Sequence, residues 1–198
     1  LTPTLCARIL KHSPEKHGRV YRALEALFSG LESRYTRTLG WAVRRKFLVV
    51  VDDSPEFETA LRYAARRARS TGGRVALLRV IPAAASDAHW AGVREEIERQ
   101  TRVEAETSLN KWAGEAAERS GATPVLLIER GEPQDAIRKV VGEDAEIKIL
   151  VLAASSGGRG PGPLVSAVVK QGASFTGRKL PVTIVPGELT EMDIEDLA

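Results

Sequence analysis

The sequence predicts an α/β domain with a doubly wound, five-stranded parallel sheet and helices on both faces of that sheet. From Lys46 onward, apolar runs of strand length alternate with segments of helical periodicity, which is the order of elements in this fold class. The runs are almost continuously apolar, as in strands that are buried on both faces. With 198 residues, the chain is long enough for one such domain and an appendage, but short for two full domains.

Five segments are predicted to be strands because each is a short apolar run of strand length. They are FLVVV (47–51), VALLRVI (75–81), PVLLIE (124–129), IKILVLA (147–153) and PVTIV (181–185). Parallel strands need right-handed crossovers, and ligands of such sheets bind beyond the carboxyl ends of the strands, where the strand order reverses. A site is therefore expected among the residues that follow the strands, which are 52–54, Pro82, 130–131 and 154–162.

Four helices are predicted between the strands, each from apolar residues at helical spacing. The inward-facing positions are Phe57, Ala60, Leu61, Ala64, Ala65 and Ala68 in the first helix; Trp90, Val93, Ile97, Ala105, Leu109, Trp112 and Ala116 in the second and longest; Ile137, Val140 and Val141 in the third; and Leu164, Val165, Val168 and Val169 in the fourth. Gly72 and Gly73 end the first helix, the turn Gly131-Glu132-Pro133 opens the third, and the fourth ends near Gly172.

The two ends of the chain differ from the main domain in charge. The whole chain has a net charge of +3, but residues 1–45 carry +6 (nine Lys/Arg against three Asp/Glu), and the remainder carries −3. We therefore divide the chain into a basic helical extension (1–45), a main domain (46–187) and an acidic tail (188–198). The extension is interpreted as a loosely held helical appendage, and alternatively as a helix that docks on this domain or on a partner, or as a basic amphipathic helix that lies on an anionic membrane. The tail, with five acidic residues and no basic one, is predicted to be solvated.

Composition disfavours several classes of function. No apolar run approaches the roughly 20 residues that span a bilayer, and the single cysteine, Cys6, can form neither an internal disulfide nor a multi-cysteine metal site, which favours a cytoplasmic location. The main domain has no basic stripe, so we expect no nucleic-acid binding. His12 and His17 lie in the extension and His89 at a helix start, so no catalytic grouping with serine or cysteine is expected.

The segment VVVDDSP first suggests a response-regulator receiver, whose first strand ends in an acidic pair that holds a metal ion. A receiver needs a phosphoacceptor aspartate at the end of its third strand and a lysine-proline pair after the fifth. Here the third strand ends Ile128-Glu129-Arg130, and the fifth runs into Val185-Pro186-Gly187. Without the phosphoacceptor the chemistry has no nucleophile, so the receiver interpretation is set aside.

A second resemblance extends over about residues 46–187. Asp52 after the first strand, an alanine-rich first helix, VALLRVIP as second strand, a long charged helix, a Gly-x-Pro turn at Gly131 and a glycine-rich loop leading to LPVTIVPG together resemble the universal stress protein family. The resemblance implies a five-stranded parallel sheet and a role in stress tolerance or regulation without catalysis. It also implies a homodimer that pairs through the last strand, here Pro181 to Val185, which would hide an exposed sheet edge.

Many members of that family bind ATP through a loop of the form Gly-x-x-Gly, nine residues, Gly-Ser/Thr. Glycines allow backbone N–H groups to approach phosphates, and the following helix N-terminus adds positive potential. In this chain the stretch is AASSGGRGPGPLVSAVVKQGAS. If Gly157 is the second glycine of the motif, Ala154 occupies the position of the first glycine, and fourteen residues separate Gly157 from Gly172. If Gly162 is the second glycine, Arg159 occupies the position of the first, and nine residues separate Gly162 from Gly172. In both registers Ala173 occupies the position at which the motif has a Ser or Thr hydroxyl.

Three interpretations of this loop remain open. It binds ATP or a related adenine nucleotide, with Mg²⁺ accompanying the nucleotide; it is stiffened by Pro161 and Pro163 for another ligand or a protein partner; or it is a connection without a ligand. In the second case the chain is a nucleotide-free interaction module that uses this loop and the basic N-terminal helix. The resemblance places Asp52 near the adenosine and the backbone of Val80 at the adenine, although Asp52 could instead cap the following helix. The predicted nucleotide-binding residues are Val51, Asp52, Asp53, Val80, Gly131, Ala154, Ser155, Gly157, Gly158, Arg159, Gly160, Gly172, Ala173 and Ser174.

Overall fold

The fold is described from a computed structural model of the whole chain. It describes residues 45–52, 54–83, 91–155, 157 and 160–198, and all of these belong to one compact unit, Val43–Ala198. The predictions for residues 1–44, including the amphipathic helix, lie outside the described residues.

The sheet has five parallel strands in the order β3-β2-β1-β4-β5, which confirms the predicted fold class. The strands are β1 (Lys46–Val51), β2 (Arg74–Ile81), β3 (Val125–Arg130), β4 (Ile147–Ala154) and β5 (Val182–Pro186). The centre of the sheet is β1, in which Leu48 pairs with Ala76 of β2 and with Leu150 of β4. Successive side chains of β1 enter opposite faces, which explains why its sequence is apolar without interruption.

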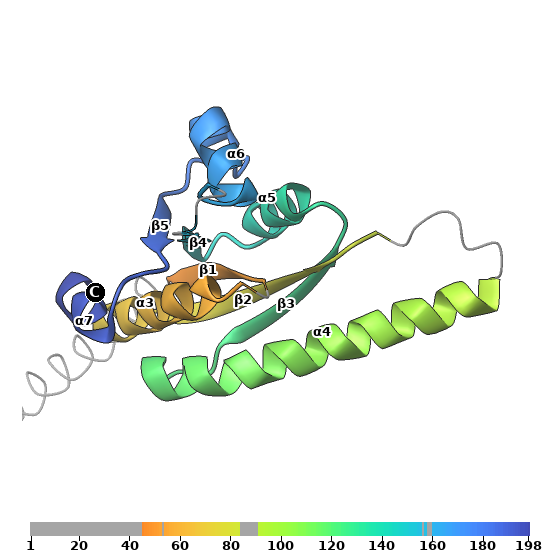
Figure 1. Cartoon of the computed structure of the whole chain (residues 1–198), viewed down its shortest axis with the longest axis horizontal. Helices are drawn as coiled ribbons and strands as arrows, with labels where there is room; N and C mark the ends of the chain where they lie inside the picture. The colour runs from red at the N-terminus through yellow and green to blue at the C-terminus, as the bar shows by residue number, and fades with distance from the viewer. Residues whose placement is uncertain (1–44, 53, 84–90, 156, 158–159) are drawn as a thin grey trace, which may run out of the picture. The chain divides into compact units, whose positions relative to one another are not determined.

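Helices cover both faces of the sheet (Figure 1). On one face lie α3 (Glu56–Thr71) and α4 (Ala91–Ser120); on the other lie α5 (Pro133–Glu143), α6 (Pro163–Gln171) and the short 3₁₀ turn η1 (Gly172–Ser174). The chain ends in a further helix, α7 (Glu191–Leu197). None of the helices within the described residues combines the length and the apolar character needed to cross a membrane.

The predicted inward faces of α3 and α5 are confirmed. All six apolar positions of α3 are buried, and Gly72 ends the helix in the left-handed conformation that glycine adopts without strain. Phe57 of α3 meets Trp112 of α4 edge to face, with ring centroids 5.0 Å apart, and joins the two helices into one layer. In α5, Ile137, Val140 and Val141 are buried as predicted.

Two inward-facing predictions are wrong. Ile97 of α4 is 55% exposed, and Val169 of α6 is 72% exposed. The 30 residues of α4 span about 45 Å, much more than a strand, so its first part runs beyond the sheet (Figure 1). Only Val165, in the first turn of α6, is buried; Leu164, Ala167 and Val168 pack on the core in part, and Val169, near the end of the helix, lies on its exposed side. The predicted positions Trp90 and Val93 lie outside the described side chains.

The segment 188–198, predicted to be a solvated tail, is a folded part of the domain, although its five acidic side chains are exposed as predicted. This segment contains α7, whose first turn is fixed by a capping box: Thr190 Oγ1 accepts from the backbone N–H of Asp193, and the Asp193 carboxylate accepts from the backbone N–H of Thr190. Ile194 is only 4% exposed. The capped first turn, the buried Ile194 and the ion pair of Glu191 with Arg119 (2.9 Å) together hold this acidic segment on the domain.

Candidate functional site

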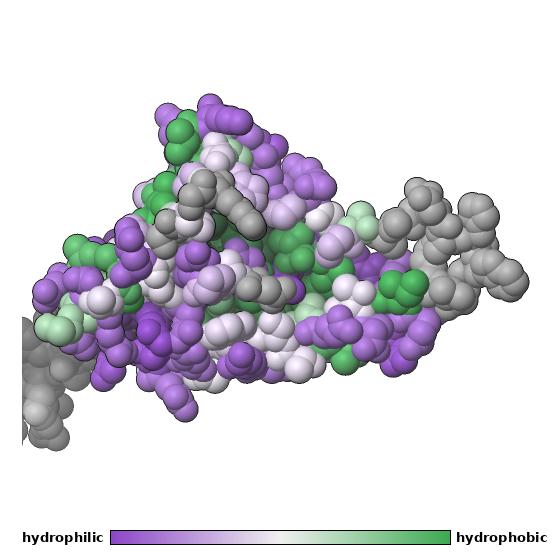
Figure 2. Space-filling model, viewed as in Figure 1, coloured by the Kyte–Doolittle hydropathy of each residue, from purple (hydrophilic) through white to green (hydrophobic). Residues whose placement is uncertain are grey.

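A cavity of about 260 Å³ lies beyond the carboxyl ends of β1 and β4. In the sheet, β2 lies on one side of β1 and β4 lies on the other, so the strand order reverses between β1 and β4. The loops that follow β1 and β4 therefore lead to opposite faces of the sheet and leave a crevice between them. Its polar lining consists of Asp52, Ser54, Glu56 and Ser155, and its apolar walls include Val50, Leu152, Leu164 and Val165. In Figure 2, hydrophobic surface is visible in the hollow below α6, whereas the surface of α4 is largely hydrophilic. The cavity coincides with the position at which the sequence predicts a ligand.

Asp52 forms a tight local turn at the rim of this cavity. Its Oδ1 accepts hydrogen bonds from Ser54 N (3.1 Å) and from Ser54 Oγ (2.6 Å). The N-cap residue of α3 is Pro55, and no side chain caps that helix, so the alternative role of Asp52 as an N-cap is not observed. Within the described part of the chain, Asp52 Oδ2 makes no hydrogen bond, which leaves a carboxylate oxygen for a ligand.

Ser155 is held by Glu56 at the first turn of α3. Ser155 Oγ donates to Glu56 Oε1 (2.9 Å), and the Gly157 backbone N–H donates to Ser155 Oγ (3.3 Å). These bonds connect the start of the glycine-rich loop to the helix that follows β1. The position of the loop therefore depends on where the Glu56 side chain lies.

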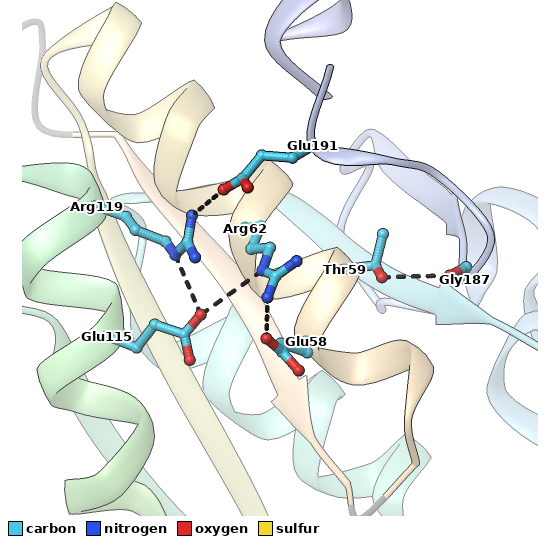
Figure 3. A network of polar contacts seen from close by, with 7 residues as sticks. All are labelled: Glu58, Thr59, Arg62, Glu115, Arg119, Gly187 and Glu191. Atoms are coloured by element: carbon cyan, nitrogen blue, oxygen red, sulfur yellow. Dashed lines mark hydrogen bonds and ion pairs between the residues drawn. The ribbon is translucent and has the colours of Figure 1, made fainter. Parts of the chain in front are cut away.

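Gly187, just after β5, sets the position of Glu56. Its N–H donates to Ala154 O (3.0 Å), and its carbonyl accepts from Thr59 Oγ1 (3.3 Å; Figure 3). A Cβ at this position would lie 2.1 Å from Glu56 Cγ and 3.3 Å from Ala154 O. Only glycine fits between β4 and α3 here. Neither Glu56 nor Gly187 is among the predicted site residues, and the signal in the sequence is limited to the place of Gly187, just after a predicted strand at the carboxyl edge.

The N-terminus of α6 faces the same cavity. Gly160 and Gly162 have φ angles of 90° and 99°, which side chains other than glycine rarely adopt, and Pro163 begins the helix. Its first N–H groups lack partners within the helix, so this end attracts anions. Two carboxylates, those of Asp52 and Glu56, line the same cavity, so its electrostatic character is mixed.

The other predicted site residues are placed as follows. Ala154 ends β4, and Gly131, with φ 113°, donates its N–H to Ile81 O (3.0 Å) at the carboxyl edge. Val51 is buried against α3 and α4, whereas Val80 packs on the opposite face. Gly172, Ala173 and Ser174 form η1 at the far end of α6 and do not line the cavity. Asp53, Gly158 and Arg159 lie outside the described residues.

A larger cavity, about 700 Å³, lies on the other side of the turn formed by Asp52 and Ser54. Side chains of α4 form its remaining wall, among them Lys111 and Trp112, with Lys111 Nζ 4.7 Å from the Trp112 ring centroid. It does not involve the glycine-rich loop, so we assign the site to the smaller cavity. Over the ranges that the structure describes, no three His, Cys, Asp or Glu residues gather as a metal site would require.

Comparison with known proteins identifies the domain. A family model described as the universal stress protein family matches residues 44–171. The universal stress protein UspA from Lactobacillus plantarum is 22% identical (TM-score 0.58; 71% of this chain and 97% of that chain covered), and the universal stress protein from Archaeoglobus fulgidus is 20% identical (TM-score 0.53; 71% and 93%). A universal stress protein solved in complex with cAMP is 18% identical (TM-score 0.51; 71% and 96%). A comparison with curated proteins gives no match.

Proposed function

We propose that this chain, which belongs to the universal stress protein family, binds an adenine nucleotide in the cavity between Asp52 and the glycine-rich loop and acts as a non-catalytic regulatory module in stress tolerance. The observation that carries the proposal is a cavity at the reversal point of the strand order, bounded by the open N-terminus of a helix. The complex of a structurally similar protein with cAMP supports the ligand class.

The lining residues fit the parts of a nucleotide. The free oxygen of Asp52 can accept hydrogen bonds from ribose hydroxyls, and the N–H groups at the start of α6 suit phosphate oxygens. Mg²⁺ bound with the nucleotide would take phosphate oxygens as ligands and would offset the charge of Asp52 and Glu56. We infer action by binding rather than by chemistry from the family to which the chain belongs, and we assign the hydroxyl of Ser155, which donates to Glu56, to fixing the loop.

Nucleotide binding is testable by thermal unfolding of the full chain with ATP, ADP, AMP or cyclic AMP, each with Mg²⁺. At a ligand concentration 100 times the Kd, binding to the folded state adds about 2.7 kcal/mol, which corresponds to a rise in Tm of roughly 5–10 °C. We expect Asp52→Ala to remove this rise, whereas Asp196→Ala, on the exposed face of α7, should leave it unchanged.

The second candidate function is a protein-interaction module without a nucleotide. It is favoured by the two carboxylates in the cavity, because they would repel phosphate in the absence of a cation. If none of the four nucleotides raises the Tm at millimolar concentration, the first proposal fails and this second function takes its place. The cytoplasmic location stays a prediction from the cysteine content.

We propose in addition that two copies pair through β5. This strand is an edge of the sheet, and Ile184 on it is 38% exposed. Ile184→Lys is expected to raise the dimer Kd by about tenfold or more, because the lysine would be placed in the interface. The matched control is Leu126→Lys, since Leu126 is 39% exposed on β3 at the opposite edge. Sedimentation velocity should show a dimer for the wild type and the control and a monomer for Ile184→Lys; a monomeric wild type would contradict the pairing.

A further inference from the structure

A third, smaller cavity of about 120 Å³ lies where α3, α4 and α7 meet. Its charged lining consists of four arginines and two glutamates: Arg62, Arg66 and Arg69 from α3, Arg119 from α4, and Glu191 and Glu195 from α7. The three arginines of α3 are spaced by four and three residues, so they lie on one face of the helix. This cavity shares no lining residue with the one beyond β1 and β4.

Carboxylates satisfy some of these guanidinium groups (Figure 3). Arg119 bridges Glu191 (2.9 Å) and Glu115 (3.1 Å), and Arg62 pairs with Glu58. The hydrogen bond from Arg119 lowers the pKa of the Glu191 carboxyl, so this carboxyl stays ionised and holds α7 in place.

Other donors of the cluster are left without acceptors. Arg62 Nε is buried and makes no hydrogen bond within the described residues; Glu115 Oε1 lies 3.8 Å from it. Arg66 reaches Glu195 only at 3.8 Å, and Arg69 forms no ion pair with any described residue; both side chains are exposed, so their N–H groups are available to a ligand, and Arg62 Nε is the one buried donor of the cluster without a partner among the described residues. A buried donor normally has a partner, since an unpaired one costs about 1–3 kcal/mol. The arginines of this cavity therefore have more N–H donors than the neighbouring glutamates can accept hydrogen bonds from.

We propose that this cavity binds a small tetrahedral oxyanion of the phosphate class, held by Arg62, Arg66 and Arg69. Guanidinium groups present paired N–H donors that match the oxygens of such an ion. The volume, about 120 Å³, suits an ion and is well below the roughly 300 Å³ or more of a typical organic-ligand pocket. Glu195 acts as an internal competitor because it approaches Arg66 (3.8 Å), and the negative charge of Glu191, which pairs with Arg119 (2.9 Å), weakens the positive potential near Arg62. The site is independent of the proposed nucleotide site.

The test is a titration of the full chain with inorganic phosphate, followed by the NMR signals of the arginine Nε–H groups, against sodium chloride at equal ionic strength. We expect a saturable shift of the Arg62 signal with phosphate only. Glu191→Gln with Glu195→Gln should tighten binding about tenfold by removing the competing charges, and Arg66→Gln with Arg69→Gln should abolish it.

The matched control for charge is Glu95→Gln with Glu143→Gln, which changes the net charge equally. Both residues are exposed and lie elsewhere on the surface, and neither side chain forms an ion pair or hydrogen bond with a described residue. This control should leave the phosphate affinity unchanged. A shift that does not saturate, an equal shift with chloride, or equal tightening in the control variant would overturn the proposal. The Arg66 and Arg69 substitutions keep Glu191 and Ile194, the residues that hold α7 on the domain. Their effect on phosphate binding therefore does not depend on the effect of the α7 substitutions.

Discussion

Gly187→Val is expected to lower the free energy of unfolding by about 3 kcal/mol, the upper part of the range for overpacked sites. The first atom added at Gly187 would already overlap Glu56 Cγ at 2.1 Å, and the carbonyl of Ala154 blocks movement in another direction. The added side chain at position 187 would therefore meet the backbone of β4 on one side, which cannot easily move. The overlap has to be removed by a displacement of the Glu56 side chain.

The same substitution is expected to abolish the nucleotide-dependent rise in Tm. A displaced Glu56 loses its hydrogen bond to Ser155, and Ser155 in turn holds the N–H of Gly157. The loop would lose the contacts that fix its start, so a ligand would have to order it at a cost of about 1–2 kcal/mol per residue. Gly187 is in this sense a positioning residue for the site.

Thermal unfolding with and without ATP and Mg²⁺ measures both effects. The control is Gly142→Ala in α5, where an added Cβ meets no atom within 4 Å and alanine favours the helix. That variant should be at least as stable as the wild type and should keep the full nucleotide effect. A Gly187→Val protein that unfolds like the wild type, or that keeps the ligand-induced rise, would contradict the role assigned to Glu56 and Gly187.

The fold could be predicted from the sequence because its strongest determinants are local. Strands buried on both faces leave uninterrupted apolar runs, and the alanine stripe of α3 marks the face that packs closely on the sheet. Periodicity does not say where a helix leaves the sheet, which is why the predictions for Ile97 and Val169 are wrong. The Thr190-x-x-Asp193 spacing is that of a capping box and indicates a helix start, a signal that the prediction of a solvated tail, made from acidity alone, does not include.

The site was predictable only in part, for a different physical reason. The carboxyl ends of the strands follow from the topology, so Asp52 and Ser155 were found from their place in the chain. The contact between Ser155 and Glu56 joins residues 99 positions apart, and the arginine cluster depends on how three helices meet. Such contacts are set by packing between elements, and no short motif encodes them.

Phe175→Ala is expected to have the largest effect on stability, about 3–5 kcal/mol. Phe175 is fully buried between the sheet and the helices α5 and α6. Its backbone N–H donates to Gly172 O (3.2 Å), and its backbone carbonyl accepts from Arg138 Nε (3.0 Å). The buried side chain of Phe175 and these two backbone bonds together anchor η1 to the core. Urea unfolding of the two proteins measures the difference; a loss below 1 kcal/mol would mean that the site collapses around the smaller side chain.

This anchoring bears on the role that the family resemblance gives to Gly172, Ala173 and Ser174. Ser174 is exposed, and its hydroxyl donates to Gln171 O (2.7 Å). If the segment serves to seat Phe175, Ser174→Ala should change the free energy of unfolding by less than about 0.5 kcal/mol and leave the nucleotide-induced rise in Tm intact. A Ser174→Ala protein that loses that rise would instead mean that η1 reaches the ligand, and that α6 must move for the nucleotide to bind.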